Sequence, residues 1–349
     1  MNPEPRTPNP EPIMPESNDI LLSVENLQVH FIGDGPVARA VDGVDFKVRR
    51  RETVCIVGES GCGKTVTALA ILGLLKQPPA SIAGGRITFD GQSLLDMTQD
   101  ELRALRGKRI AMVFQEPMTS LNPVFTVGDQ IGETVLVHER VSTAEVRRRT
   151  IQLLDDVGIV DPQQRAGDYP HQLSGGQRQR VMIAMALACE PDLIIADEPT
   201  TALDVTVQAQ ILSLLKKLKQ EKNMAIQYIT HDLGVVAAIA DRVYVMYAGV
   251  VVEQGTTDVI FRKARHPYTI ALLDALPTKK KRGLRLYNIP GSVPHPAYRP
   301  NGCPFHPRCE YREPSCENTF PALCDYGRGH KARCPILFAT QDRAEEAHA

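Results

Sequence analysis

The sequence predicts an α/β fold in which short buried strands alternate with helices. Three short, mainly apolar segments have the composition of strands inside a parallel sheet: Thr53–Val57, 193–196 and 225–229. A glycine-rich turn joins the first of them to an apolar helix expected over residues 66–75, which makes a strand–loop–helix unit. The 349 residues leave room for about two domains and a sizeable core.

The composition excludes several classes of protein. Hydrophobic residues at 43% and charged residues at 23% are ordinary for a globular protein, so general disorder is excluded. Forty basic residues against 41 acidic ones argue against a protein held by nucleic-acid phosphates, and we expect no nucleic-acid partner. No apolar run approaches the ~20 residues that span a bilayer, and we expect no secretory signal. Any membrane role is therefore expected to come through partners.

The N-terminal part begins with a proline-rich stretch. Residues 1–18 carry six prolines and almost nothing apolar, so we predict a disordered leader. Strand-like patterning starts near Ile20, and a second strand is expected over residues 40–48, before the buried strand Thr53–Val57.

Helices are expected in the middle of the chain, and a hairpin follows them. Residues 119–180 are predicted to be mostly helical, with helices over Val127–His138 and 143–157. After the two later buried strands, Arg242–Tyr247 and 250–254 have the pattern of two strands joined as a hairpin.

The loop after the first buried strand carries a phosphate-binding pattern. Residues 58–65 read G-E-S-G-C-G-K-T and fit G-x-x-x-x-G-K-[ST] without a mismatch. Glycines let successive backbone N–H groups point inward, and the following helix adds its positive N-terminus. Lys64 would neutralise the β- and γ-phosphates, and the Thr65 hydroxyl would hold Mg²⁺; the alternative is a structural turn. The candidate ATP-binding residues are Gly58, Glu59, Ser60, Gly61, Cys62, Gly63, Lys64 and Thr65.

The strand over residues 193–196 leads into two carboxylates, Asp197 and Glu198. The end of a strand is where an α/β sheet presents its ligand-binding residues. Asp197 would complete the Mg²⁺ shell, and Glu198 is suited to polarise an attacking water, so hydrolysis is expected. The alternative is that the acidic pair only caps a helix.

Leu173-Ser-Gly-Gly-Gln177, between these two motifs, resembles the signature of ABC-type ATPases. Further residues follow the family's order: Gln115 is similar to its Q-loop glutamine, Asp204 to its D-loop and His231 to its switch histidine. Phe31 is placed like the aromatic that stacks on adenine. The resemblance implies that Glu198, His231 and Gln115 act in catalysis, that Gln115 and His231 also contact ATP, and that Gln115 joins Thr65 and Asp197 around Mg²⁺.

The same resemblance implies an ABC cassette, a P-loop NTPase fold with a RecA-like core sheet, an antiparallel β-subdomain and a helical subdomain. The cassette would span residues 19–265, with the helical subdomain at about 119–180. Ser174, Gly175, Gly176 and Gln177 would contact ATP held by a facing ATPase subunit, so the chain needs such a partner. Residues 116–128 would receive a short helix of a membrane-spanning subunit; the alternative is that this segment is core.

From His266 the composition shifts to proline, basic residues and cysteine, and we place a boundary there. Blocks at 266–269, 289–294 and 302–309 resemble the C-terminal extension of oligopeptide/dipeptide importer ATPases, a family that also serves nickel uptake. The extension would span residues 266–337, before a tail at 338–349. The resemblance implies a second, different ATPase subunit, two transmembrane permease subunits, an external solute-binding protein and a peripheral position on the cytoplasmic face of the plasma (inner) membrane.

Five cysteines lie in this extension. Five and six residues separate Cys303, Cys309 and Cys316, wider than the close pairs typical of structural zinc. We therefore expect a structural [4Fe–4S] cluster, with zinc or unligated thiols as alternatives. The resemblance places the fourth ligand at Cys334, with Cys324 as the alternative.

Two functions remain open at this stage. The first is an ATP-hydrolysing subunit that energises import of di- or oligopeptides, or a related solute. The second is a soluble ABC ATPase acting on ribosomes or DNA, although such proteins usually carry two cassettes or a long coil between loop and signature. Residues 66–172 show neither feature, and the sequence does not specify the solute.

Overall fold

A sheet of eight strands runs through the part of the molecule that the structure, a computed structural model, describes: residues 19–201, 203–276 and 288–337. Five neighbouring strands are parallel, in the order β9 (Arg242–Tyr247), β3 (Thr53–Val57), β8 (Ala225–Thr230), β7 (Leu193–Asp197) and β6 (Ile110–Val113). One edge continues antiparallel through β10 (Val250–Thr256), β12 (Lys331–Ala332) and β11 (Cys324–Asp325). The predicted leader 1–18 and tail 338–349 lie outside the described residues.

The parallel strands are buried on both faces, as their composition predicts. Along β3, Val54 and Ile56 belong to one hydrophobic core, and Cys55 and Val57 belong to the other. Successive side chains of a strand point to opposite faces, so each of these strands joins both cores.

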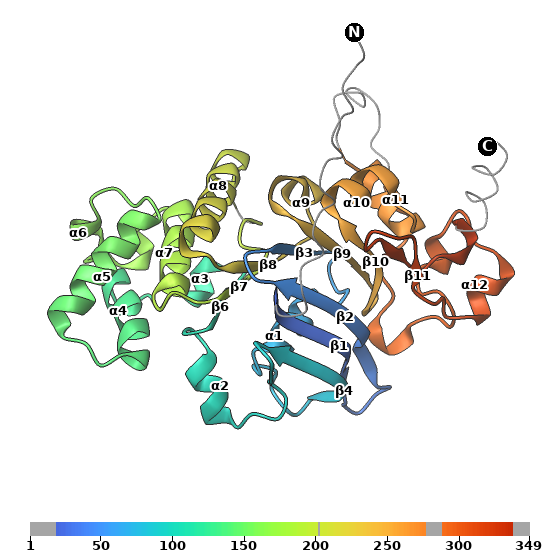
Figure 1. Cartoon of the computed structure of the whole chain (residues 1–349), viewed down its shortest axis with the longest axis horizontal. Coiled ribbons are helices and arrows are strands. Elements are labelled where there is room, and N and C mark those ends of the chain that lie inside the picture. The colour runs from blue at the N-terminus through green and yellow to red at the C-terminus, as the bar shows by residue number, and fades with distance from the viewer. Residues whose placement is uncertain (1–18, 202, 277–287, 338–349) are drawn as a thin grey trace, which may run out of the picture.

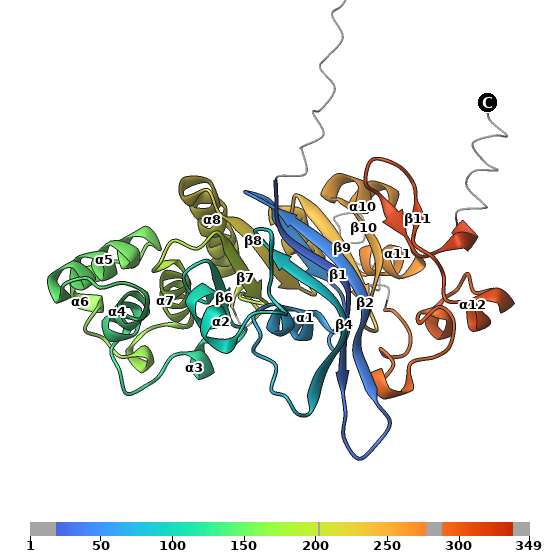
Figure 2. The ribbon, with the colours of Figure 1, turned by 60° about the horizontal axis from the view of Figure 1, so that its bottom comes forward.

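A second, antiparallel sheet covers one face of the central sheet. Its strand order is β2 (Ala38–Arg49), β1 (Ile20–Phe31), β4 (Ala80–Phe89) and β5 (Gln92–Ser93). Figure 2 shows β1, β2 and β4 side by side in front of the central strands. Residues of this sheet, of helix α1 (Lys64–Ile71) and of one face of the central sheet share a single core.

Helices form the opposite core. A group of them lies at one end of the molecule, on the left in Figure 1. This group comprises α3 (Pro117–Ser120), α4 (Val127–His138), α5 (Thr143–Asp156), α6 (Pro162–Arg165) and α7 (Gly175–Leu187). Elsewhere lie α2 (Gln99–Leu105), α8 (Val205–Lys222), α9 (Leu233–Ile239) and α10 (Thr257–Lys263).

The N-termini of two helices show why these helices begin where they do, and one of them begins earlier than predicted. The helix expected from residue 66 begins at Lys64, directly after Gly63, whose φ of 99° ends the loop. The signature helix begins at Gly175, because Ser174 caps it through a hydrogen bond from the Gln177 N–H. Helix α4 has the predicted bounds.

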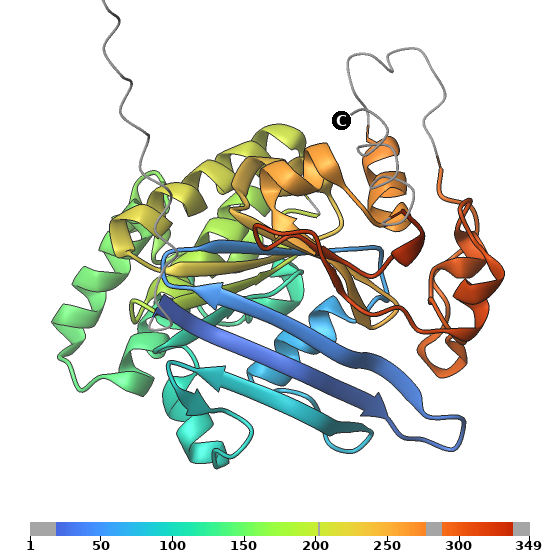
Figure 3. The ribbon, with the colours of Figure 1, turned by 45° about the vertical axis from the view of Figure 1, so that its right-hand side comes forward.

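Residues 266–276 and 288–337, here called the C-terminal segment, contain little regular structure. They include α11 (Pro267–Asp274) and α12 (Pro314–Asn318) and lie at the far end from α4–α6 (Figure 3). The fully buried Glu253 of β10 holds the segment by accepting hydrogen bonds from the Arg265 and His266 N–H groups, at 2.7 and 3.0 Å, and by pairing with His330 at 2.8 Å. These buried polar contacts attach the segment to the central sheet, and its buried residues Tyr268, Ile289 and Phe305 join one of the two hydrophobic cores.

No helix within the described ranges combines the length and the apolarity needed to cross a membrane.

The buried His266 predicts a pH-dependent stability. Its Nδ1 accepts the Tyr268 N–H as the cap of α11, and burial lowers the pKa of His266 to about 4. An unfolded histidine titrates near 6.5, so between these values the unfolded chain binds a proton that the native chain does not. The free energy of unfolding should therefore fall by about 1–2 kcal/mol as the pH drops from 7 to 5 through this group.

The measurement is urea unfolding at pH 7 and pH 5. His266→Asn keeps a side chain that can cap the helix but removes the titrating group. We expect a smaller pH-dependent loss in this variant than in the natural chain. Equal losses of unfolding free energy in the two proteins would contradict the assignment of this pH dependence to His266.

Candidate nucleotide site

The loop between β3 and α1 has a shape that its glycines make possible. A Cβ on Gly58 would lie 2.1 Å from the Met246 carbonyl oxygen, so no larger residue fits there. Gly63 has φ 99°, and a Cβ on it would lie 2.4 Å from the Ala40 carbonyl oxygen. The loop is therefore packed closely between β2 and β9, and it leads straight into the N-terminus of α1.

Lys64 folds back over this loop. Its Nζ donates to the carbonyl oxygens of Gly58 and Glu59, at 2.7 and 3.0 Å, and lies 3.6 Å from Glu198 Oε1. Only 5% of the residue is exposed. A buried ammonium next to a helix N-terminus gives this place two sources of positive potential, which suits an anion.

Thr65 and Asp197 meet although 132 positions separate them. The Thr65 hydroxyl donates to Asp197 Oδ1 at 3.2 Å. Asp197 is 2% exposed, and burial raises the pKa of this carboxyl group above its ordinary value. Hydroxyl and carboxylate oxygens are the protein ligands that Mg²⁺ prefers, so the chemistry of this pair fits the ion.

Glu198 and His231 lie at the ends of neighbouring parallel strands and contact each other. Glu198 Oε2 lies 2.9 Å from His231 Nδ1 and accepts a hydrogen bond from the Thr201 hydroxyl at 3.0 Å. The backbone of Glu198 has φ 44°, which is uncommon for a residue other than glycine. Such strain is often found at functional sites, where the surroundings hold the residue in place.

A cleft of about 810 Å³ brings most of the predicted residues together. Those that line it are Phe31, Glu59, Ser60, Gly61, Gly63, Lys64, Thr65, Gln115, Glu198 and His231. Gly58 and Cys62 are not among its lining residues. The Cys62 side chain is fully buried, and burial raises the pKa of its thiol to about 11, so the thiol is neutral at pH 7.

Part of the cleft wall could not be predicted from the sequence. Leu272, His295 and Pro296, all from the C-terminal segment, line the same cleft as Phe31 and Lys64. No spacing rule connects them to the phosphate loop, because more than 200 positions separate them and only the tertiary fold brings them close.

The signature residues do not line this cleft. Ser174 and Gln177 form a capping box at the start of α7, and a Cβ on Gly176 would lie 2.8 Å from a methyl group of Val207. Asp204 caps α8 by accepting the N–H groups of Thr206 and Val207, both at 3.0 Å. In the single chain these residues have structural contacts, and none of them lines the cleft.

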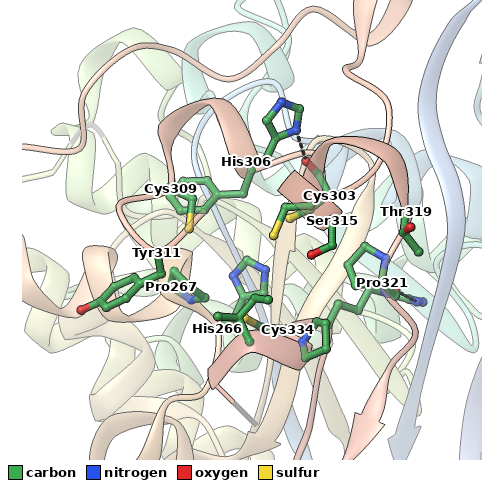
Figure 4. A pocket seen from close by; sticks show the side chains of 15 residues that line it. His266, Pro267, Cys303, His306, Cys309, Tyr311, Ser315, Thr319, Pro321 and Cys334 are labelled. Atoms are coloured by element: carbon green, nitrogen blue, oxygen red, sulfur yellow. Dashed lines mark hydrogen bonds between the residues drawn. The ribbon is translucent and has the colours of Figure 1, made fainter. Parts of the chain in front are cut away.

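The predicted iron–sulfur cluster is wrong. Cys303, Cys309, Cys316 and Cys334 line one cavity of about 150 Å³, which Cys324 does not reach. Figure 4 shows the labelled cysteines spread around that cavity, among His266, Pro267 and Pro321. In the described ranges, no group of three or more His, Cys, Asp or Glu side chains is arranged to hold a metal ion, which argues equally against zinc.

The surroundings of these thiols explain the error. Aromatic and proline side chains make up much of the cavity wall, and burial raises the pKa values of Cys303 and Cys309 to about 11. Sequence spacing showed that the cysteines cluster, but not that their side chains lie around an apolar cavity.

Comparison with known families identifies two regions of the chain. A family model described as "ABC transporter" matches residues 41–201, which include the loop and the acidic strand end. A second model, "Oligopeptide/dipeptide transporter, C-terminal region", matches residues 252–316.

Curated relatives match over nearly the whole chain. The dipeptide transport ATP-binding protein DppD of Escherichia coli (strain K12) is 51% identical over 314 residues, covering 90% of this chain and 96% of DppD. DppD of Bacillus subtilis is 48% identical over 327 residues, or 94% and 97% of the two chains. The probable peptide ABC transporter ATP-binding protein y4tR of Sinorhizobium fredii is 51% identical over 317 residues, or 90% and 95%.

Solved structures agree on the fold. The dimeric post-hydrolysis structure of the ATP-binding cassette MJ0796, bound to ADP and Pi, matches with a TM-score of 0.61 and 31% identity, over 68% of this chain and 98% of that cassette. CbiO1 from Clostridium perfringens matches with the same TM-score and identity, over 70% of this chain and 92% of CbiO1. Because relatives with about half their residues identical extend over nine-tenths of the chain, this protein belongs to the ABC ATPases, in the family of ATP-binding subunits of oligopeptide/dipeptide transporters.

Proposed function

We propose that this ABC ATPase energises the import of dipeptides or oligopeptides through a membrane transporter. The observation that carries the proposal is the convergence of Lys64, Thr65, Asp197, Glu198 and His231 at one edge of the sheet. The extensive identity with relatives named as dipeptide and peptide transport ATP-binding proteins supports the choice of solute.

In this proposal the loop binds the phosphates of ATP. Backbone N–H groups of residues 60–65 and the Lys64 ammonium contact phosphate oxygens, and Phe31 stacks against the adenine. Thr65, Asp197 and Gln115 would hold Mg²⁺, which would supply positive charge that offsets the charge of the phosphates. The burial of Asp197 supports this role, because a buried carboxyl group is stabilised when a cation or a hydrogen-bond donor compensates its charge.

Glu198 and His231 act on the water that attacks the γ-phosphate. Their mutual distance of 2.9 Å lets His231 orient the carboxylate, and Thr201 fixes the same oxygen from the other side. Glu198 is then positioned to accept a proton from water while Lys64 neutralises negative charge nearby.

A facing ATPase subunit completes the site. Ser174, Gly175, Gly176 and Gln177 lie away from the chain's own cleft and at the N-terminus of a helix, which supports contact with the ATP of a neighbour. Gly176 packs against Val207 of α8, close to Asp204, so the D-loop and the signature would move together when two subunits close.

The membrane permeases dock on the helical end. A groove of about 660 Å³ runs between α4, α5 and α6, and its lining includes Leu136 and Val137. These two side chains are 55% and 69% exposed, and Val124 and Phe125 nearby are also exposed. Leu121, in contrast, belongs to the core, so only part of the segment 116–128 is free to receive a partner helix.

The proposed assembly has five components. We propose a second, related ATPase subunit, two permease subunits and an external binding protein, with this chain attached peripherally at the cytoplasmic face of the inner membrane. The chain itself would divide into a cassette over residues 19–265, with a helical subdomain at about 119–180, and a cysteine-rich extension over residues 266–337.

Replacing Lys64 tests the phosphate loop. Lys64→Ala removes a charge-assisted contact and should weaken ATP binding by about 1.5–3 kcal/mol. Fluorescence titration with a labelled ATP measures the loss, and Lys216→Ala, a change at an exposed lysine of α8, serves as the control. Unchanged affinity in Lys64→Ala would refute the assignment.

Replacing Glu198 separates binding from hydrolysis. Glu198→Gln keeps the shape of the side chain but cannot accept the proton, so ATP should bind while turnover falls by 10²-fold or more, on the order of a lost general base. Size-exclusion chromatography with ATP should then show a persistent ATPase dimer. A variant that hydrolyses ATP at the normal rate would exclude this role.

The solute is tested on the assembled transporter. Co-expression with the permease and ATPase chains encoded beside it should yield a membrane complex whose ATP hydrolysis rises when dipeptide-loaded binding protein is added. Stimulation by a different solute would correct the substrate. Co-purification with ribosomes or DNA, and no membrane partner, would exclude the import function.

A further inference from the structure

The C-terminal segment binds Glu59 of the phosphate loop through Tyr268 and Arg308. The Glu59 N–H donates to the Tyr268 hydroxyl at 2.9 Å. Its carboxylate accepts two hydrogen bonds from Arg308, with Nη1 at 2.7 Å from Oε2 and Nη2 at 3.0 Å from Oε1. Its carbonyl oxygen accepts from Lys64 at 3.0 Å. Every backbone and side-chain polar group of Glu59 is thus engaged, two of them by the C-terminal segment.

Arg308 is itself held in place. Its Nε donates to the Pro290 carbonyl oxygen at 2.7 Å, and its guanidinium lies 5.7 Å from the Tyr247 ring centre and 5.9 Å from that of Phe305. The side chain is 5% exposed. Burial disfavours its charge, but the hydrogen bonds to Glu59 and Tyr247, together with the charge interactions with these two residues, outweigh burial and raise the pKa of Arg308 above its ordinary value. A buried fork of this kind pairs with a carboxylate in one geometry, which a lysine cannot reproduce.

The contact with Arg308 is most important for the conformational order of the phosphate loop. Residues 58–63 include three glycines, which lose more conformational freedom on ordering than other residues. A loop that is already ordered loses less entropy when it binds phosphate, so its affinity is higher. Glu59 lies between Gly58 and the residues that would contact phosphate, and its carbonyl oxygen helps to position Lys64.

We infer that Arg308 and Tyr268 are positioning residues for nucleotide binding: they hold Glu59 and, through it, keep the phosphate loop in its binding shape. The inference rests on the proposed ATP site and adds a function for the C-terminal segment. Neither residue touches the nucleotide in this scheme. Because coupling is reciprocal, bound ATP also strengthens the attachment of the segment to the cassette.

The test compares ATP affinities of the full chain, measured with a fluorescent, non-hydrolysable ATP analogue and Mg²⁺. Arg308→Met should raise the Kd about tenfold, and Arg308→Lys should recover only part of the loss. The assembled transporter should show a raised KM for ATP with kcat changed by less than about twofold. Tyr268→Phe, which removes only a hydroxyl group, should raise the Kd about threefold. This second variant tests the inference even if Arg308→Met does not fold.

Arg333→Met is the matched control. Arg333 is also a partly buried arginine of the C-terminal segment, but its hydrogen bonds end on the carbonyl oxygens of Val251 and Pro321, away from the loop. The Kd of the Arg333→Met variant for the ATP analogue should stay within about twofold of the Kd of the natural chain. In the Glu59→Gln background, Arg308→Met should add little, because the two changes remove one interaction.

Three results would overturn the inference: an unchanged Kd in Arg308→Met and Tyr268→Phe, a loss in Arg333→Met equal to that in Arg308→Met, or additive effects of Glu59→Gln and Arg308→Met. Lys64→Ala in the same assay separates this failure from failure of the ATP site. If Lys64→Ala weakens binding and Arg308→Met does not, only the positioning role is excluded. If Lys64→Ala binds normally, the proposed function itself fails.

Discussion

The register of the parallel strands is the constraint on which the site depends. Val57 of β3 pairs with Thr230 of β8, and Asp197 of β7 pairs with Ile229. Three strands therefore end at nearly the same height, and the chain leaves each of them at the same edge of the sheet. The phosphate loop, the acidic pair and His231 follow these ends directly, so a shift of one residue in either pairing would separate groups that now lie 3–4 Å apart.

Charge burial is the second feature that the site uses. Lys64 and Asp197 are almost completely buried, and each has a partner: Lys64 donates to carbonyl oxygens, and Asp197 accepts from Thr65. Burying a charge is costly unless the charge is paired. The buried charges of Lys64 and Asp197 therefore create a strong electrostatic potential at the edge of the sheet. An anion and a divalent cation arriving together would compensate both charges. This arrangement explains how a chain of near-zero net charge can bind a highly charged nucleotide.

The C-terminal segment depends on the cassette for its structure. Buried Glu253 attaches both the start of it, at His266, and a part near its end, at His330, to β10. The ion pair between Arg308 and Glu59 attaches another part to the phosphate loop. Tyr268 and Phe305 pack together between these attachments, with ring centres 5.3 Å apart. Phe305 also lines the apolar cavity around which Cys303, Cys309, Cys316 and Cys334 lie.

The amino-acid sequence alone predicts the buried strands β3, β7 and β8, the phosphate loop and the order of the motifs. Local patterns carry this information: the apolar run Thr53–Val57, the glycines at fixed spacing and the carboxylates at the end of β7 each act through near neighbours. The tertiary structure decided what distant residues do. Arg308 reaches the phosphate loop and His295 lines the cleft because the fold brings their segment back to this edge of the sheet. Four of the cysteines line a cavity together with aromatic and proline side chains of the same segment. Spacing along a chain cannot fix the direction of a side chain in an irregular segment, since no helix or strand period relates its residues.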